Sequence, residues 1–259
     1  MNNLIKKVHD FLDEYELETA ESPYIIAFSG GYDSMCLLHI LKTITKHRII
    51  AVHLNHNWRG EESLAEETKC KDFCKNIGVE FYSETLPDIV PKTETAARDA
   101  RYEFFEKCAQ KYNSNIVFTA HNANDNAETL IYRLAKGTSI DGLSGIAPVR
   151  DIFYRPLLKV LRAEIEAYCM ENNLSPNTDS SNLNTKYKRN LIRHTIIPQL
   201  EQINQDTIIA INSLSDLAKD DSEYLNTISK MIGTSTIKFI QAVPSIQGRY
   251  LIAAETRTV

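Results

Sequence analysis

Four short apolar runs, each followed by a longer amphipathic segment, constrain the fold of this chain more than any other feature. The runs are rich in Ile, Val, Phe and Tyr, as strands are, and they lie at 24–28, 49–55, 79–86 and 115–122. The segments between them place apolar residues at helical spacing, as at Leu37, Leu38, Leu41 and Ile44. Repetition of strand and helix predicts an α/β, Rossmann-like parallel sheet with helices on both faces.

The pattern changes in the second half of the chain. From about residue 160 it is mostly helical, and 201–259 is expected to contain helices only. We therefore expect one α/β domain over 1–200, followed by a small helical segment at 201–259 that is the start of a shortened second domain.

Composition narrows the class of protein. The chain has 259 residues, 43% of them hydrophobic and 24% charged, which is typical of a soluble globular protein. Neither a signal peptide nor an apolar run approaching the ~18 residues of a membrane span is visible, so we expect a cytoplasmic protein without a membrane partner. The net charge of -5 argues against indiscriminate binding to nucleic acid, although it allows a local basic face.

The five cysteines are scattered and include no C-x-x-C pair. This spacing argues against a disulfide framework, a zinc ribbon and an iron-sulfur site.

The turn "SGGYDS" at 29–34 follows the first strand and precedes a helix. Backbone amides left free by Gly30, Gly31 and the helix end would converge on one point, which favours an anion. The turn is neither a Walker A loop nor a G-x-G-x-x-G loop. Asp33 would repel a bare phosphate, so it indicates either a divalent cation between the carboxylate and phosphates or a helix cap. A plain glycine turn capped by Ser and Asp is the alternative.

This turn resembles the pyrophosphate-binding loop of the PP-loop ATPases, which cleave ATP between its α and β phosphates and adenylate a substrate. Further stretches, in order from about residue 24 to 200, resemble the tRNA(Ile)-lysidine synthetase family. They are "VHLNHNWRGEES", "ARDARYEFF", "TAHNANDNAETLIYRLAKGTSIDGLSGI", "RPLLKVLRAEIEAYC" and "DSSNLNTKYKRNLIRHTIIPQL".

The resemblance implies that 1–200 is a PP-loop ATP-binding catalytic domain that uses ATP and Mg²⁺. It implies ligation of free L-lysine to the wobble cytidine of the isoleucine tRNA with a CAU anticodon. The cytosine carbonyl oxygen attacks the α phosphorus and releases pyrophosphate, and the lysine amine then attacks the activated ring carbon and expels AMP. The sequence leaves open whether the protein is a homodimer.

The same resemblance implies roles for individual residues. The expected catalytic residues are Asp33, Arg101, His121, Asp125 and Glu128. The expected ATP-binding residues are Ser29, Gly30, Gly31, Asp33, Ser34 and His53, with Asp33 also holding the metal. The expected tRNA-binding residues are Arg98, Arg133, Arg189, Asn190 and Arg193. Within this set we expect Asp125 to anchor lysine, and His121 or Glu128 to act as the base.

Several of these residues have simpler interpretations. Asp125 and Glu128 lie in the first turn of a predicted helix, where carboxylates stabilise the helix without catalysis. Glu94 is spaced to pair with Arg98, whereas no acid lies three or four residues from Arg101, which favours Arg101 for a phosphate contact. His53 continues a strand and could pack in the core or beside adenine.

The chain also departs from the family pattern. Asn124 stands where the family has an aspartate, Asn126 where it has Gln, and Asn122 where a second histidine is common. Two alternatives to the lysidine synthetase interpretation stay open, and Asn124 favours the second of them. One is another PP-loop tRNA-modifying enzyme such as a thiolase, and the other is a catalytically silent tRNA-binding homologue.

Overall fold

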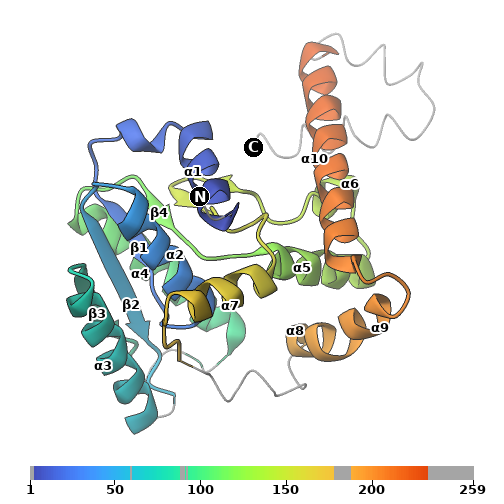
Figure 1. Ribbon diagram of the computed structural model, residues 1–259. Helices are drawn as coiled ribbons and strands as arrows, with labels where there is room; N and C mark the ends of the chain where they lie inside the picture. The colour runs from blue at the N-terminus through green and yellow to red at the C-terminus, as the bar shows by residue number, and fades with distance from the viewer. Residues whose placement is uncertain (1–2, 59, 88–90, 92, 178–187, 233–259) are drawn as a thin grey trace.

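The computed structural model describes residues 3–58, 60–87, 91, 93–177 and 188–232, which are built around one six-stranded sheet (Figure 1). Its strands are β1 (Tyr24–Ala27), β2 (Ile49–Asn55), β3 (Glu80–Thr85), β4 (Val117–Phe118), β5 (Val149–Arg150) and β6 (Phe153–Tyr154). The order is β3-β2-β1-β4-β6-β5, and every pair is parallel except β5 with β6. The predicted parallel sheet and its first four strands are confirmed, and β4 is shorter than predicted.

The β5–β6 hairpin was not predicted. Each strand has two residues, which is too short to show an alternating pattern, and the turn between them places Asp151 at a φ of 55°. The hairpin brings Arg155 to the carboxyl end of β6, beside the end of β4.

Helices lie on both faces of the sheet, as predicted. Those before residue 178 are α1 (Asn3–Glu14), α2 (Tyr32–Ile44), α3 (Glu61–Asn76), α4 (Glu94–Lys111), α5 (Ala123–Lys136), α6 (Ile140–Leu143) and α7 (Arg162–Glu171), with a short 3-10 turn η1 (Leu17–Thr19). Alternate strand residues point to opposite faces. Ile26 and Ala51 pack with α1, α2, α3 and α7, whereas Ile25 and Ile50 pack with α4.

A third apolar cluster joins α5 to the last part of the described chain. That part consists of α8 (Lys188–Leu191), a π-helical turn η3 (Ile192–Ile196), α9 (Ile197–Glu201) and α10 (Thr207–Ile232). Ala127 of α5 packs with Ile192, Ile197 and Ile208. These contacts place η3 against the N-terminal half of α5, while α10 extends away from the sheet (Figure 1).

The helical prediction for 201–259 is supported over 207–232, and residues 233–259 lie outside the described part of the chain. Among the described helices, none combines the length and apolar character that a membrane crossing needs.

Candidate functional site

The glycine turn after β1 has a backbone that only glycine adopts easily. Gly30 has a φ of 79°, and a Cβ built on it would lie 2.5 Å from Cys70 Sγ and 2.7 Å from Asn177 Nδ2. The backbone N–H of Asn177 donates to the Gly30 carbonyl at 2.9 Å. The turn therefore packs against Cys70 of α3 and is hydrogen-bonded to Asn177 in the segment after α7.

The helix that follows this turn begins without a side-chain cap. Gly31 is the N-cap residue of α2 and has no side chain that could accept from the first-turn amides. The hydroxyls of Ser29 and Ser34 lie 3.1 Å apart, and Ser34 donates to the Gly31 carbonyl at 3.2 Å, which closes the turn around the helix end. An uncapped helix N-terminus preceded by glycines is suited to receive phosphate oxygens.

Asp33 lies in the first turn of α2 and faces the neighbouring helix end. Its Oδ1 accepts from Asn122 Nδ2 at 2.9 Å. Burial raises the pKa of Asp33, and Asp125 raises it further, while Arg162, the Asn122 hydrogen bond and Arg193 oppose the shift. A cation beside Asp33 would relieve both the burial and the repulsion, and Mg²⁺ prefers one or two carboxylates together with phosphate oxygens. The donor set fits such an ion.

The second helix end, at α5, is closed by its own side chains. Asn122 is the N-cap residue and accepts from the amides of Asn124 and Asp125, while Asp125 Oδ2 accepts from the Asn122 amide at 3.1 Å. The capping interpretation of Asp125 is thus correct for one oxygen. Its other oxygen, Oδ1, lies 3.4 Å from Arg193 Nη2.

Glu128 lies one turn further along α5 and is 1% exposed. Arg193 of η3 donates to it from Nε at 2.6 Å and from Nη2 at 3.1 Å, a bidentate ion pair. Burial raises the pKa of Glu128 and Arg193 opposes the shift. Arg193 was predicted to bind tRNA, but its guanidinium is engaged by the two carboxylates of α5.

His121 immediately precedes the α5 cap. Its Nδ1 lies 3.0 Å from the hydroxyl of Thr119. Burial lowers the pKa of His121 to about 4, helped by Arg155, Arg98 and Arg189 and opposed by Asp125. The imidazole is therefore neutral at pH 7, and its low pKa makes it a weaker base than an exposed histidine.

Two histidines of the β2 end have different surroundings. His53 is buried and its Nδ1–H donates to the Phe28 carbonyl at 2.9 Å, so it joins β2 to the residue before the glycine turn. This agrees with the core interpretation, and adenine contact stays a prediction. His56 Nε2 lies 3.5 Å from Arg101 Nη2, and burial, with Arg101, lowers the pKa of His56 to about 4. Arg101 therefore lies beside the end of β2.

The other predicted tRNA-binding residues make separate contacts within the protein. Arg133 donates to the carbonyls of Gly142 and Gly145 at 2.8 and 2.9 Å and so holds the segment after α6. Arg189 Nη2 lies 3.5 Å from Thr129 Oγ1, and Arg98 Nη2 donates to the Tyr102 hydroxyl at 3.3 Å. Asn190 lies in α8. Their RNA contacts stay predictions.

The departures from the family pattern have structural roles here. Asn124 Oδ1 accepts from the backbone amide of Arg162 at the start of α7 at 3.0 Å. Asn126 donates to Asn212 of α10 at 2.9 Å and accepts from the Ile146 amide at 2.7 Å. Both asparagines therefore join α5 to neighbouring elements.

Sequence reasoning did not include Asn177 or Arg162 in the site, and it treated Asn122 only as a departure. Asn177 reaches the glycine turn from a segment almost 150 residues later in the chain. The signal for Asn122 was present in "TAHN", where an asparagine before a helix is a common N-cap. No local pattern marked the other two.

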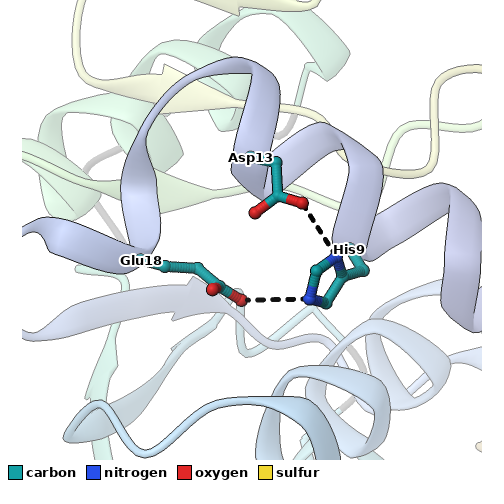
Figure 2. A group of neighbouring side chains, drawn as sticks. All are labelled: His9, Asp13 and Glu18. Atoms are coloured by element: carbon teal, nitrogen blue, oxygen red, sulfur yellow. Dashed lines mark ion pairs between the residues drawn. The ribbon is translucent and has the colours of Figure 1, made fainter.

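A separate group of polar side chains lies on α1 and η1 (Figure 2). His9 Nδ1 lies 3.0 Å from Asp13 Oδ2 and its Nε2 lies 3.6 Å from Glu18 Oε1. In the described part of the chain this is the one trio of ligand-type residues whose ligand atoms all lie within 4.8 Å of one another. Each carboxylate faces a different ring nitrogen, whereas one metal ion takes one nitrogen of an imidazole. The contacts fit a histidine held between two carboxylates.

The sheet topology and the open, glycine-led end of α2 agree with comparison to known families. The family model of the PP-loop domain matches residues 1–200, so the chain belongs to the PP-loop family. Curated relatives are named tRNA(Ile)-lysidine synthase. The chain is 42% identical over 232 residues to that of Clostridium perfringens, covering 85% of this chain and 49% of the relative. It is 35% identical over 241 residues to that of Bacillus subtilis, covering 87% and 50%. The chain spans about half the length of these relatives.

Solved structures share the fold. The U34-tRNA thiolase NcsA from Methanococcus maripaludis, solved with its [4Fe-4S] cluster, superposes with a TM-score of 0.65 at 16% identity, covering 83% of this chain and 78% of that one. The NH3-dependent NAD synthetase from Campylobacter jejuni superposes at 0.50 and 16% identity, covering 83% and 93%. At this identity the likeness shows the fold alone.

The resemblance to the lysidine synthetase family is confirmed by the sequence comparison.

Proposed function

We propose that this chain carries the catalytic half of a ligase that joins lysine to the wobble cytidine of the isoleucine tRNA with a CAU anticodon, using ATP. One observation carries the proposal. An uncapped helix end suited to phosphates and a capped helix end bearing carboxylates are joined by the Asn122–Asp33 hydrogen bond. The relatives' names support the choice of substrate.

The first helix end would hold the nucleotide. The amides of Gly30, Gly31 and the α2 end would receive phosphate oxygens, and Asp33 would hold Mg²⁺. When bound, ATP supplies the adenylyl group that activates the base, with release of pyrophosphate, and lysine then displaces AMP. Arg101 would neutralise phosphate charge from the β2 side.

The second helix end would hold lysine. Asp125 and Glu128 carry two negative charges when ionised, and the one positive charge of Arg193 bonds to both of them. The remaining negative charge favours one ammonium group. A lysine amine with an ordinary pKa near 10.4 is protonated at pH 7, and removing that proton costs roughly 4 to 5 kcal/mol. His121, which is neutral, or Glu128 would accept it.

The RNA would approach the side of the site that carries Arg98, Arg133, Arg189 and Asn190, while Arg193 stays paired with Asp125 and Glu128. Flipping an unpaired anticodon base costs little, which suits chemistry on a wobble nucleotide. We further propose a boundary near residue 200 between a catalytic domain and a helical segment, and cytoplasmic residence. A homodimer stays open.

The thiolase alternative is not favoured. All five cysteines are buried free thiols, and none belongs to a C-x-x-C pair. The catalytically silent alternative rested in part on Asn124, whose side chain accepts a backbone hydrogen bond that an aspartate would also accept.

The decisive experiment measures labelled lysine in tRNA transcripts with ATP and Mg²⁺ present. We expect label in the CAU isoleucine tRNA and none in the methionine tRNA that shares its anticodon, with AMP and pyrophosphate released. Absence of label while ATP still binds would contradict the proposal, and Asn124→Asp would then test the silent alternative. Unchanged turnover in Asp125→Asn would contradict its assignment as lysine anchor.

A further inference from the structure

Arg155 is a buried arginine whose hydrogen bonds are incomplete. The residue is 3% exposed and follows β6 at the carboxyl end of the sheet. Its Nη1 donates to the Ala147 carbonyl at 2.7 Å, whereas Nε has no hydrogen-bond partner among the residues that the structure describes. Buried donors are nearly always satisfied, so this one calls for a ligand or a physical reason.

Tyr102 lies at the centre of a group of arginines that includes Arg155. Arg98 donates to its hydroxyl at 3.3 Å, and the guanidinium carbons of Arg98 and Arg150 lie 4.9 and 5.3 Å from its ring centroid. Arg155 faces the same hydroxyl. The ring is fixed by an edge-to-face contact with Phe153 at 4.8 Å. Two guanidinium groups thus lie over the ring of Tyr102, and a third faces its hydroxyl.

The positive charge of this group is poorly compensated. Of the side chains described, only Asp151 forms an ion pair with it, at 3.9 Å from Arg150. Burial is the largest influence on the pKa of Arg155 and lowers it, and Arg150 and Arg98 act in the same direction. A buried cation without a carboxylate is costly unless an anion joins it.

The group lies next to the candidate site. Arg98 and Arg155 both lower the pKa of His121. Arg155 follows β6 and His121 follows β4, and these two strands are paired neighbours.

We propose that Arg155, Arg98 and Tyr102 form a phosphate-binding subsite beside His121. Guanidinium forks match phosphate oxygens, and the free Nε of Arg155 supplies a donor that no described group uses. The phosphate belongs either to the triphosphate of ATP or to the RNA backbone beside the reacting nucleotide. The inference rests on the proposed function, because that function names these two ligands.

The test compares Arg98→Gln and Arg155→Lys with the control Arg48→Gln. Arg48 also lies over a tyrosine ring, 5.7 Å from the Tyr112 centroid. It pairs with Glu80 of β3, which is at the opposite edge of the sheet from the β5–β6 hairpin. ATP with Mg²⁺ is titrated in one arm. The anticodon arm of the CAU isoleucine tRNA is titrated in the other, at several salt concentrations. Neither arm needs lysine transfer, so the result is separable from that of the ligase assay.

We expect both site variants to weaken one ligand about tenfold or more relative to Arg48→Gln. If the phosphate belongs to RNA, the slope of log affinity on log salt also falls by about one. If it belongs to ATP, RNA binding is unchanged. Folded variants that bind both ligands as tightly as the control would overturn the proposal. Arg155 is buried, so Arg155→Lys can fail to fold. Arg98 is partly exposed, and in that case the ligand affinities of Arg98→Gln test the proposal.

Discussion

The N-termini of α2 and α5 follow neighbouring parallel strands and meet at the same edge of the sheet, yet their first-turn amides are capped differently. The α2 end has glycine at its cap and no side-chain acceptor, so its amides remain for a ligand. The α5 end satisfies its amides with Asn122 and Asp125 and holds the carboxylates of Asp125 and Glu128 against Arg193. One backbone geometry thus favours an anion at one end and a cation at the other, because the capping residues decide which groups remain.

Gly30→Ala should break the open end most severely. An alanine at a φ of 79° with Cβ 2.5 Å from Cys70 Sγ combines backbone strain with overpacking. We expect the unfolding free energy to fall by about 2 to 5 kcal/mol. ATP affinity should be lost, and denaturant unfolding and nucleotide titration measure the two effects.

Gly31→Ala is the matched control. Its φ is -77°, and the nearest atom to an added Cβ is Ser29 Oγ at 3.6 Å, an ordinary contact. We expect a loss of about 1 kcal/mol at most. Equal losses in the two variants would show that the backbone of Gly30 has no special role.

Glu128→Gln should break the capped end next. It leaves the Arg193 guanidinium without its bidentate partner in a largely buried setting, and we expect a loss of about 2 to 4 kcal/mol in unfolding free energy. KM for lysine should rise while ATP affinity is kept. The control is Glu103→Gln, because the Glu103–Lys107 pair is fully exposed and contributes little. An ATP affinity that falls with the lysine affinity would contradict the division of roles.

Asn122→Ala tests the link between the two ends. It removes the α5 cap, which costs about 1 kcal/mol, and also the hydrogen bond to Asp33. Thr93→Ala removes the α4 cap, where Thr93 accepts from the Ala96 amide and does not touch Asp33. Both variants should lose similar stability by thermal unfolding, and only Asn122→Ala should need more Mg²⁺ for ATP binding. If Thr93→Ala shares that need, the Asn122–Asp33 link is not its cause.

The smallest effect concerns His121 in front of the capped end. Its pKa is about 4 in the folded chain and 6.5 ordinarily, so the folded state binds fewer protons. Its stability contribution is present above pH 6.5 and is lost as the pH falls from 6.5 towards 4. Between pH 7 and 6 the loss is about 0.7 kcal/mol. The unfolding free energy of the unaltered protein and of His121→Gln is measured at both pH values. The difference between their pH dependences gives the contribution of His121, because His56, whose pKa is also lowered, is present in both proteins. Identical pH dependence in the two would show that His121 is not buried neutral.

Many residues of this site could be predicted from the sequence. The strand runs, the glycine turn and the carboxylates of the α5 segment are local signals, and each was found where the structure has it. The roles of Arg193 and Arg155 were not found, because a basic residue looks the same in sequence whether it faces solvent or a buried carboxylate. The β5–β6 hairpin was missed because two-residue strands have no readable period.

The sequence by itself determined the four parallel strands β1 to β4, the helices that follow them and the residues at the carboxyl ends of β1 and β4, since these follow from periodicity and glycine chemistry over a few neighbours. Only the tertiary structure decided which charges meet. Asn177 supports the glycine turn, Asn122 binds Asp33, and Arg193 reaches Glu128 from 65 residues away. Such contacts depend on packing between distant elements, and no local pattern encodes them.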